Sequence, residues 1–296
     1  MRYLDAVTIT QLKGLRLFPK NLANSSEMAG AHKNPVRGFS RDFFQHRPYV
    51  PGDDPRTLDW KVYARLDRFY VREFESENLF TSQIILDQSR SMIFHSDTNP
   101  PKWDYACRLA MAISWLTLSQ GDALGLMTVS SGIGIEVPPR SGFPRLEILD
   151  ARLSEISPQG LSSPETALPM TASHIKKRSL IILISDLMGN TEEFIKGIVS
   201  LKTGRNEVIV FHVIDPRERD LNFEAPVVFQ GMEEEGEVAV GDQEFRLRYA
   251  AEFEKQIKTY QSAFHQNQIS HQLFTTDRPL EESLRRFLRK SALRVR

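Results

Sequence analysis

The chain has 296 residues, enough to bury one large hydrophobic core or two smaller ones. Hydrophobic residues make up 41% and charged residues 26% of it, a composition that argues against intrinsic disorder. Lysine plus arginine and aspartate plus glutamate both number 38, so no net charge attracts nucleic acid or an anionic membrane to the whole surface.

The N-terminal part of the chain differs from the rest in composition. It contains a short predicted helix, a polar stretch around Asn21–Pro35, and a dense charged and aromatic stretch over Arg37–Glu77. We predict an N-terminal extension over residues 1–80 and an α/β domain over residues 81–296.

The charged and aromatic stretch allows two interpretations. A Pro51-Gly52 turn is followed by opposite charges that can neutralise one another, which would fasten the extension to a neighbouring domain. The same side chains can instead bind another protein. The candidate partner surface comprises Arg47, Tyr49, Asp53, Asp54, Arg56, Asp59, Trp60 and Arg65.

From residue 81 onward, short apolar runs alternate with helical patterns. Strands are predicted at Gln83–Leu86, Ala123–Val129, Ile133–Val137, Leu180–Ser185 and Glu207–Ile214. Helices are predicted at Trp103–Leu118, Arg145–Ile156, Pro164–Lys177 and Thr191–Lys202. The alternation predicts a mostly parallel sheet with helices on both faces, and the turn at residues 130–132 predicts an antiparallel edge strand.

The C-terminal part adds an excursion and a closing unit. Residues 216–245 hold two apolar runs around an acidic turn, which predicts a small β-hairpin insertion. A helix over Arg246–His265, a strand over Ser270–Phe274 and a helix over Pro279–Arg289 are predicted to follow.

Hydroxyls and carboxylates follow two of the predicted strands. Asp87, Ser89 and Ser91 come directly after the first strand, Asp186 follows the strand Leu180–Ser185, and Thr166 opens an intervening helix. Open α/β sheets bind ligands at the carboxyl ends of their strands. Because oxygen donors without imidazole or thiolate suit a hard cation, we predict that these residues bind Mg²⁺ or Mn²⁺.

The same residues also allow readings without a metal. Asp-x-Ser-x-Ser is a common turn sequence, and its oxygens can simply cap the following helix. Alternatively, the side chain of Arg90 or of a lysine can take the place of the ion. If the ion is present, its neutral serine and threonine ligands leave it with a net positive charge and an open position for a carboxylate.

Together, Asp87-x-Ser89-x-Ser91, Thr166 and Ser185-Asp186 resemble the metal-ion-dependent adhesion site (MIDAS) of von Willebrand factor A (vWA) domains. The resemblance implies a Rossmann-like vWA fold. It also implies that the serines and the threonine contact the ion, while the aspartates act directly or through water.

Longer motifs resemble the domain-of-unknown-function 58 (DUF58) family, a vWA-like family. They are His46-Arg-Pro-Tyr-Val-Pro-Gly-Asp-Asp-Pro-Arg-Thr-Leu-Asp-Trp60, Tyr70-Val-Arg-Glu-Phe-Glu-Ser-Glu77, His212-Val-Ile-Asp-Pro-Arg-Glu218 and Asp277-Arg-Pro-Leu280. Members tend to accompany MoxR-type AAA+ ATPases, which implies an adaptor partnership. Many relatives carry N-terminal membrane helices, and this chain departs from them, so we expect no membrane span and a cytoplasmic protein.

The leading hypothesis is therefore a non-catalytic, metal-dependent interaction module whose protein partner supplies an acidic residue. One alternative is a Mg²⁺-dependent hydrolase or phosphotransferase that uses Asp87 or Asp186 to orient water, with His95 as the candidate base. Another is a structural scaffold without metal. We expect no nucleic-acid partner, and the lack of a glycine-rich phosphate loop argues against ATP hydrolysis by this chain.

Overall fold

The computed structural model describes residues 1–17, 43–49, 58–74, 81–96, 99–158, 163–175, 178–221, 227–230, 237–240 and 243–293. The chain forms two compact units. One comprises Met1–Lys20 and Phe80–Arg296, and the other comprises Asn21–Leu79. Residues 1–17, which the prediction placed in the extension, pack within the larger unit.

The smaller unit contains a strand pair with a helix between the strands. Strand β1 (Phe43–Pro48) pairs antiparallel with β2 (Tyr70–Phe74), and α4 (Trp60–Leu66) lies between them in the sequence. The rings of Tyr63 and Phe69 stack with centroids 4.5 Å apart. These aromatic contacts connect the helix to the residues that lead into β2.

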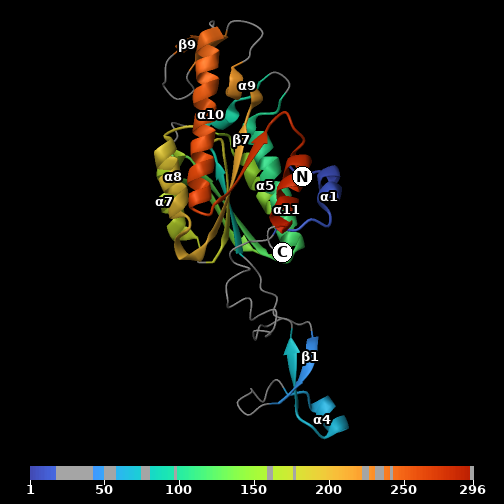
Figure 1. Ribbon diagram of the computed structural model, residues 1–296. Coiled ribbons are helices and arrows are strands. Elements are labelled where there is room, and N and C mark those ends of the chain that lie inside the picture. Colours follow the sequence, from blue (N-terminus) through green and yellow to red (C-terminus); the bar gives the residue numbers. More distant parts are fainter. Residues whose placement is uncertain are drawn as a thin grey trace. The chain divides into compact units, whose positions relative to one another are not determined.

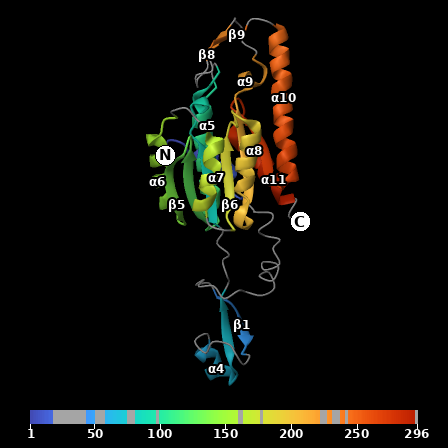
Figure 2. The ribbon, with the colours of Figure 1, turned by 90° about the vertical axis from the view of Figure 1, so that its left-hand side faces the viewer.

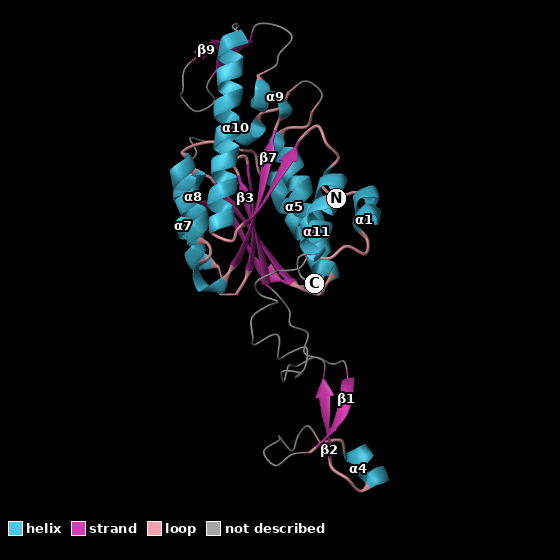
Figure 3. Ribbon diagram, viewed as in Figure 1, coloured by secondary structure: helices cyan, strands magenta, loops and turns pink. Residues whose placement is uncertain are grey.

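The larger unit is built on a six-stranded sheet with the order β10-β7-β6-β3-β4-β5 (Figure 3). Its strands are β3 (Thr81–Asp87), β4 (Ala123–Val129), β5 (Ile133–Arg140), β6 (Leu180–Ser185), β7 (Glu207–Ile214) and β10 (Ser270–Thr275). Neighbouring strands are parallel except β4 and β5, which are antiparallel. This confirms the predicted α/β class and the predicted antiparallel edge.

Helices cover both faces of this sheet (Figure 1). One face packs against α1 (Ala6–Leu12), α5 (Lys102–Ser119), α6 (Pro144–Glu155) and α11 (Leu280–Leu293). The other packs against α7 (Pro164–His174), α8 (Thr191–Ser200) and α10 (Gln243–Gln266). In Figure 2, α7 and α8 lie in front of the sheet. Because both faces are covered, β6 and β7 are buried along their full length, as expected for parallel strands with continuous apolar sequences.

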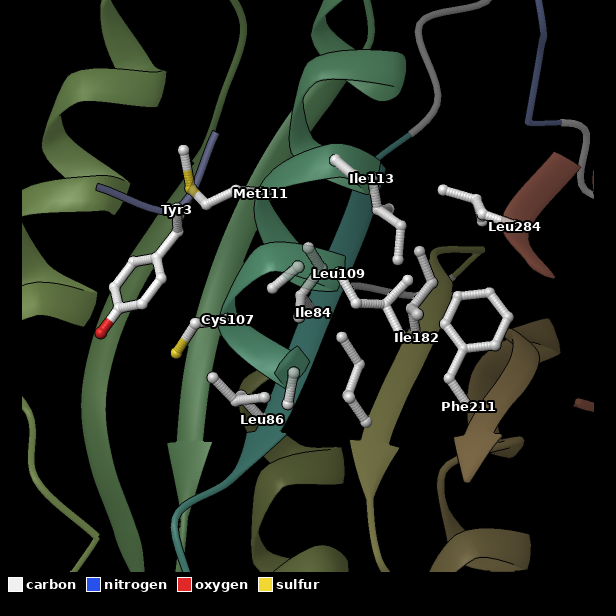
Figure 4. Close-up of a cluster of buried hydrophobic side chains, with 14 of the residues drawn as sticks. Tyr3, Ile84, Leu86, Cys107, Leu109, Met111, Ile113, Ile182, Phe211 and Leu284 are labelled. Atoms are coloured by element: carbon white, nitrogen blue, oxygen red, sulfur yellow. The ribbon is translucent and has the colours of Figure 1, made fainter. Parts of the chain in front are cut away.

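The larger core lies between the sheet and α5 (Figure 4). Leu109 and Ile113 of this helix are fully buried in the same cluster as Ile84 of β3. Cys107 is also buried there, and burial raises the pKa of its thiol well above the ordinary value. A buried thiol whose pKa is raised is chemically inert.

The N-terminal residues join this core. Tyr3 and Leu12 are buried in the cluster, and the backbone N–H of Tyr3 donates to Oδ1 of Asp150 at 2.9 Å. On α1, the hydroxyl of Thr8 donates to Oε1 of Glu281 at 2.5 Å. A short amphipathic segment alone does not reveal such long-range partners.

The predicted insertion over residues 216–245 contains α9 (Pro216–Asp220) and the antiparallel strands β8 (Val227–Gln230) and β9 (Glu237–Val240). Helix α10 follows, and its first turns extend beyond the sheet in both views (Figures 1 and 2). Its buried residues begin only at Phe253. The early turns of α10 therefore contribute little to the core.

Two histidines lie together beneath α10. His212 of β7 and His271 of β10 have ring centroids 5.6 Å apart, and each ring has one buried nitrogen without a hydrogen-bond partner in the described structure. Burial lowers the pKa of His212 to about 3 and that of His271 to about 4. Both rings are therefore neutral in the folded protein at physiological pH.

Acid is expected to destabilise the fold through these rings. The unfolded chain takes up protons near pH 6.5, whereas folded His271 does so only near pH 4, so the free energy of unfolding decreases as the pH falls through that window. Replacing His271→Phe should make the loss between pH 7.5 and pH 5 smaller, as measured by urea denaturation. The exposed His265→Phe serves as the control, and equal pH dependence in both variants would contradict the assignment.

Candidate metal-binding site

The predicted ligands lie where the connection order of the sheet changes direction. From β3 the chain passes to β4 on one side, and later returns to β6 on the other side. Because Leu86 pairs with Ile184, the two strands end near the same level, with Asp87 beside Ser185 and Asp186 at the next position. Such a switch point is where open α/β sheets form their ligand crevices.

The loop after β3 groups its hydroxyls around Asp87. One carboxylate oxygen of Asp87 accepts the backbone N–H of Ser89 at 2.8 Å, and the other accepts the hydroxyl of Ser185 at 2.5 Å. The hydroxyl oxygens of Ser89 and Ser91 lie 2.9 Å apart. The structure therefore brings Asp87, Ser89 and Ser91 together as predicted from their spacing.

Electrostatics at Asp87 favour a nearby cation. Burial and the carboxylate of Asp186 raise the pKa of Asp87 to about 7, although the hydrogen bonds from Ser185 and Ser89 lower it. The described residues contain no group of three or more His, Cys, Asp or Glu side chains that could hold a metal, so a cation here would depend on the serine hydroxyls. Hard oxygen donors of this kind fit Mg²⁺ or Mn²⁺.

Asp186 already has a positively charged neighbour. Nζ of Lys102 donates to Oδ2 of Asp186 at 2.7 Å and also donates to Oε1 of Glu218. The other oxygen of Asp186 accepts the backbone N–H of Met188 at 3.1 Å. Of the two residues considered as replacements for the ion, Arg90 is exposed, whereas a lysine does contact the site.

The ion pairs keep Lys102 charged despite its burial. Its side chain is 0% exposed, and burial alone would lower its pKa, but Asp186 and Glu218 raise it above the ordinary value. Burial raises the pKa of Glu218, and Lys102 partly counters this. The three side chains thus form one buried charged network.

Thr166 lies apart from this hydrogen-bonded group. Its side chain is exposed, and its hydroxyl donates to the carbonyl of Ser163 at 2.8 Å within the first turn of α7. The same turn approaches the loop that follows β6, since the Glu165 carboxylate oxygens lie 3.5 Å from the position that a Cβ on Gly189 would occupy. The hydroxyl donates only its hydrogen to Ser163 and keeps its oxygen lone pairs, so this bond does not by itself prevent Thr166 from acting as a ligand.

Residues 45–259, which include most of the sheet, match the family described as "Protein of unknown function DUF58". The chain belongs to the DUF58 family. Its mostly parallel sheet with flanking helices is the α/β class predicted for it.

Uncharacterized proteins of Mycobacterium tuberculosis and Mycobacterium bovis are related to this DUF58 protein. Each is 27% identical to it over 209 residues, or 69% of the chain. The chain spans only 64% of the length of these relatives.

Solved structures with similar folds include BatB of Bacteroides thetaiotaomicron, a conserved hypothetical protein. It has 16% sequence identity and a TM-score of 0.45, with 72% of this chain and 98% of that one covered. An aerotolerance-related membrane protein of Bacteroides fragilis has 17% identity and a TM-score of 0.45, with 71% and 99% covered. The SpRpn10 VWA domain has 11% identity and a TM-score of 0.40, with 70% and 95% covered.

In the part of this DUF58 protein that the structure describes, no helix has both the length and the apolar character needed to cross a bilayer.

Only part of the candidate partner surface falls on described side chains. Asp53, Asp54 and Arg56, together with the side chain of Arg47, lie outside the described residues. Asp59 caps α4, because its Oδ1 accepts the backbone N–H groups of Lys61 and Val62 at 3.0 and 3.3 Å.

The other described members of this surface are Tyr49, Trp60 and Arg65. Tyr49 is half-buried and contacts the ring of Phe69 edge-on. Trp60 is 61% exposed, and Arg65 is exposed as well. Trp60 and Arg65 therefore remain the side chains of this surface that a partner can contact.

The sequence reasoning missed the residues that support the site, namely Lys102, Asp215 and Glu218. Asp215 accepts the hydroxyl of Ser96 at 2.5 Å and that of Thr276 at 3.0 Å, and it forms a capping box with Glu218 at the start of α9. An Asp-Pro-x-Glu sequence does indicate a helix start. A lysine in the first turn of α5 is unfavourable to the helix dipole, and this was the available signal for Lys102.

Proposed function

We propose that this DUF58 protein is a non-catalytic interaction module that binds a protein partner through a divalent cation. Asp87, Ser89, Ser91 and Asp186, with Thr166, would hold Mg²⁺ or Mn²⁺. The observation that supports this proposal best is the grouping of the Ser89 and Ser91 hydroxyls beside two carboxylates at the switch point of the sheet.

Bound there, the ion would supply positive charge for an acidic residue of the partner. The neutral hydroxyls offset none of this charge. The hydrogen bonds from Ser185 and from the backbone of Ser89 fix the orientation of the Asp87 carboxylate. Burial of that carboxylate excludes water, which strengthens its attraction for a cation.

The partner that we propose is a protein bearing an exposed aspartate or glutamate, and the family resemblance favours a MoxR-type AAA+ ATPase. In this arrangement the ATPase hydrolyses ATP, and this chain acts as its adaptor in the cytoplasm.

A capture experiment tests the metal bridge. The tagged protein is incubated with native extract in Mg²⁺, in EDTA, and as Asp87→Asn in Mg²⁺, with the exposed Asp277→Asn as the control. We expect the wild type and the control to retain a partner in Mg²⁺ only, and Asp87→Asn to lose at least about tenfold, the factor that corresponds to about 1.4 kcal/mol.

Equal capture in all lanes would contradict the proposed mechanism. Thermal unfolding of each variant separates loss of the site from loss of the fold. Turnover of generic phosphate esters by the Mg²⁺-loaded protein, abolished in Asp87→Asn, would instead establish the hydrolase alternative.

A further inference from the structure

Lys102 is a fully buried cation that directly contacts the candidate metal site. Its ammonium group donates to Oδ2 of Asp186 at 2.7 Å and to Glu218, and it lies 5.7 Å from the centre of the Phe94 ring. Its side chain has no exposed area. Removing a lysine from water so completely is costly unless carboxylates compensate for it.

Both carboxylate oxygens of Asp186 already accept a hydrogen bond. Oδ2 accepts from Lys102, and Oδ1 accepts the backbone N–H of Met188. A metal ion at the site would therefore share this carboxylate with the ammonium group and would be repelled by it. Glu218 weakens this repulsion, because its carboxylate accepts from the same ammonium group and partly neutralises its charge.

We propose that Lys102 is a built-in competing cation that sets the affinity of the site for divalent metal, and that Glu218 modulates this competition. The inference rests on the metal site of the proposed function. Its consequence is that the site binds metal weakly by itself and more tightly when a partner carboxylate adds negative charge. Metal and partner would then promote each other's binding by the same factor.

The proposal predicts opposite effects for two substitutions that break the same ion pair. Lys102→Gln removes the competing positive charge, so Mn²⁺ should bind at least about tenfold more tightly. This is a lower bound, because a unit charge about 4 Å away at an effective dielectric constant of about 20 changes the affinity by more than this factor. Glu218→Gln removes the carboxylate that partly neutralises Lys102. The ammonium group then repels the ion more strongly, so Mn²⁺ should bind about tenfold more weakly. The exposed pair variants Lys255→Gln and Glu252→Gln should leave the affinity unchanged.

Opposite signs distinguish competition from a merely structural role. If Lys102 only holds Asp186 in place, breaking the pair from either side disturbs Asp186, and both variants bind Mn²⁺ more weakly or equally. The measurement is Mn²⁺ titration followed by electron paramagnetic resonance at constant pH, with no partner present. Circular dichroism and thermal unfolding identify the temperature at which each variant is fully folded.

The outcomes separate this inference from the proposed function. Wild-type binding with tighter binding by Lys102→Gln and weaker binding by Glu218→Gln supports both. If the wild type binds Mn²⁺ but the two variants do not shift its affinity in opposite directions, the competition is overturned and the metal site is still supported. If only Lys102→Gln binds Mn²⁺, the competition holds but the wild-type protein is not a metal-dependent module, and absence of binding in every variant overturns both.

Discussion

Replacing Lys102 by methionine is expected to lower the free energy of unfolding by about 3–5 kcal/mol, the usual cost of breaking a buried ion pair from one side. The substitution nearly preserves side-chain volume, so packing around the start of α5 changes little. It leaves the carboxylates of Asp186 and Glu218 buried without the ammonium group that both of them contact. Urea denaturation at pH 7.5 measures the loss.

The pH dependence of this loss identifies its electrostatic origin. Without the ammonium group, a buried carboxylate in the variant takes up a proton at a higher pH than in the unfolded chain, so the variant regains stability as the pH falls. The difference between variant and wild type should therefore shrink from pH 7.5 to pH 5. A difference that stays constant would indicate a packing defect instead.

An exposed lysine provides the control for this substitution. Lys255 forms a surface ion pair with Glu252, and both side chains are 73% exposed. Lys255→Met should change the free energy of unfolding by no more than about 0.5 kcal/mol. A loss as large as that of Lys102→Met would mean that burial is not the cause.

Substitution Asp215→Ala is expected to cost at least about 3 kcal/mol, because each buried donor left without an acceptor costs about 1–3 kcal/mol. The donors are the backbone N–H and the hydroxyl of Ser96, the hydroxyl of Thr276 and the backbone N–H of Arg217. They come from three separate segments, so this carboxylate connects the ends of β7 and β10 with the loop that follows η2 (Arg90–Ile93).

Asp215→Asn is the matched variant, since it retains one oxygen acceptor in nearly the same volume. We expect an intermediate loss of stability for it. Thermal unfolding of both variants measures the difference, and a loss below about 0.5 kcal/mol for Asp215→Ala, typical of a surface site, would contradict the structural role assigned to the carboxylate.

Much of the fold was predictable because strand and helix periods are local properties. The strands Ala123–Val129, Leu180–Ser185 and Glu207–Ile214 have the bounds predicted for them. Helix α10 begins three residues before the predicted Arg246, in turns that lie outside the core and therefore show no apolar period. Where burial does not impose a pattern, the sequence gives a weaker signal for the start of a helix.

The residues of the candidate site also differ in how far the sequence alone could predict their contacts. Asp87, Ser89 and Ser91 are close in sequence, and a short loop after a strand brings them together. Thr166 was predicted to join them, and in the structure its hydroxyl donates to the carbonyl of Ser163, a local backbone acceptor at the start of α7. Local hydrogen bonds of this kind compete with long-range ones and are common for threonine.

By itself, the sequence determined the family, the α/β alternation and the placement of two carboxylates at strand ends, because each depends on residue order over short distances. Only the tertiary structure decided that residues 1–17 join the core of the larger unit and that Lys102 lies between Asp186 and Glu218. These partners are far apart in the chain, separated by 84 and 116 residues from Lys102. A lysine is normally exposed, and the position of Lys102 in the first turn of α5 gives only a weak local signal. The carboxylates that stabilise its burial come from distant segments and contact it only in the folded unit.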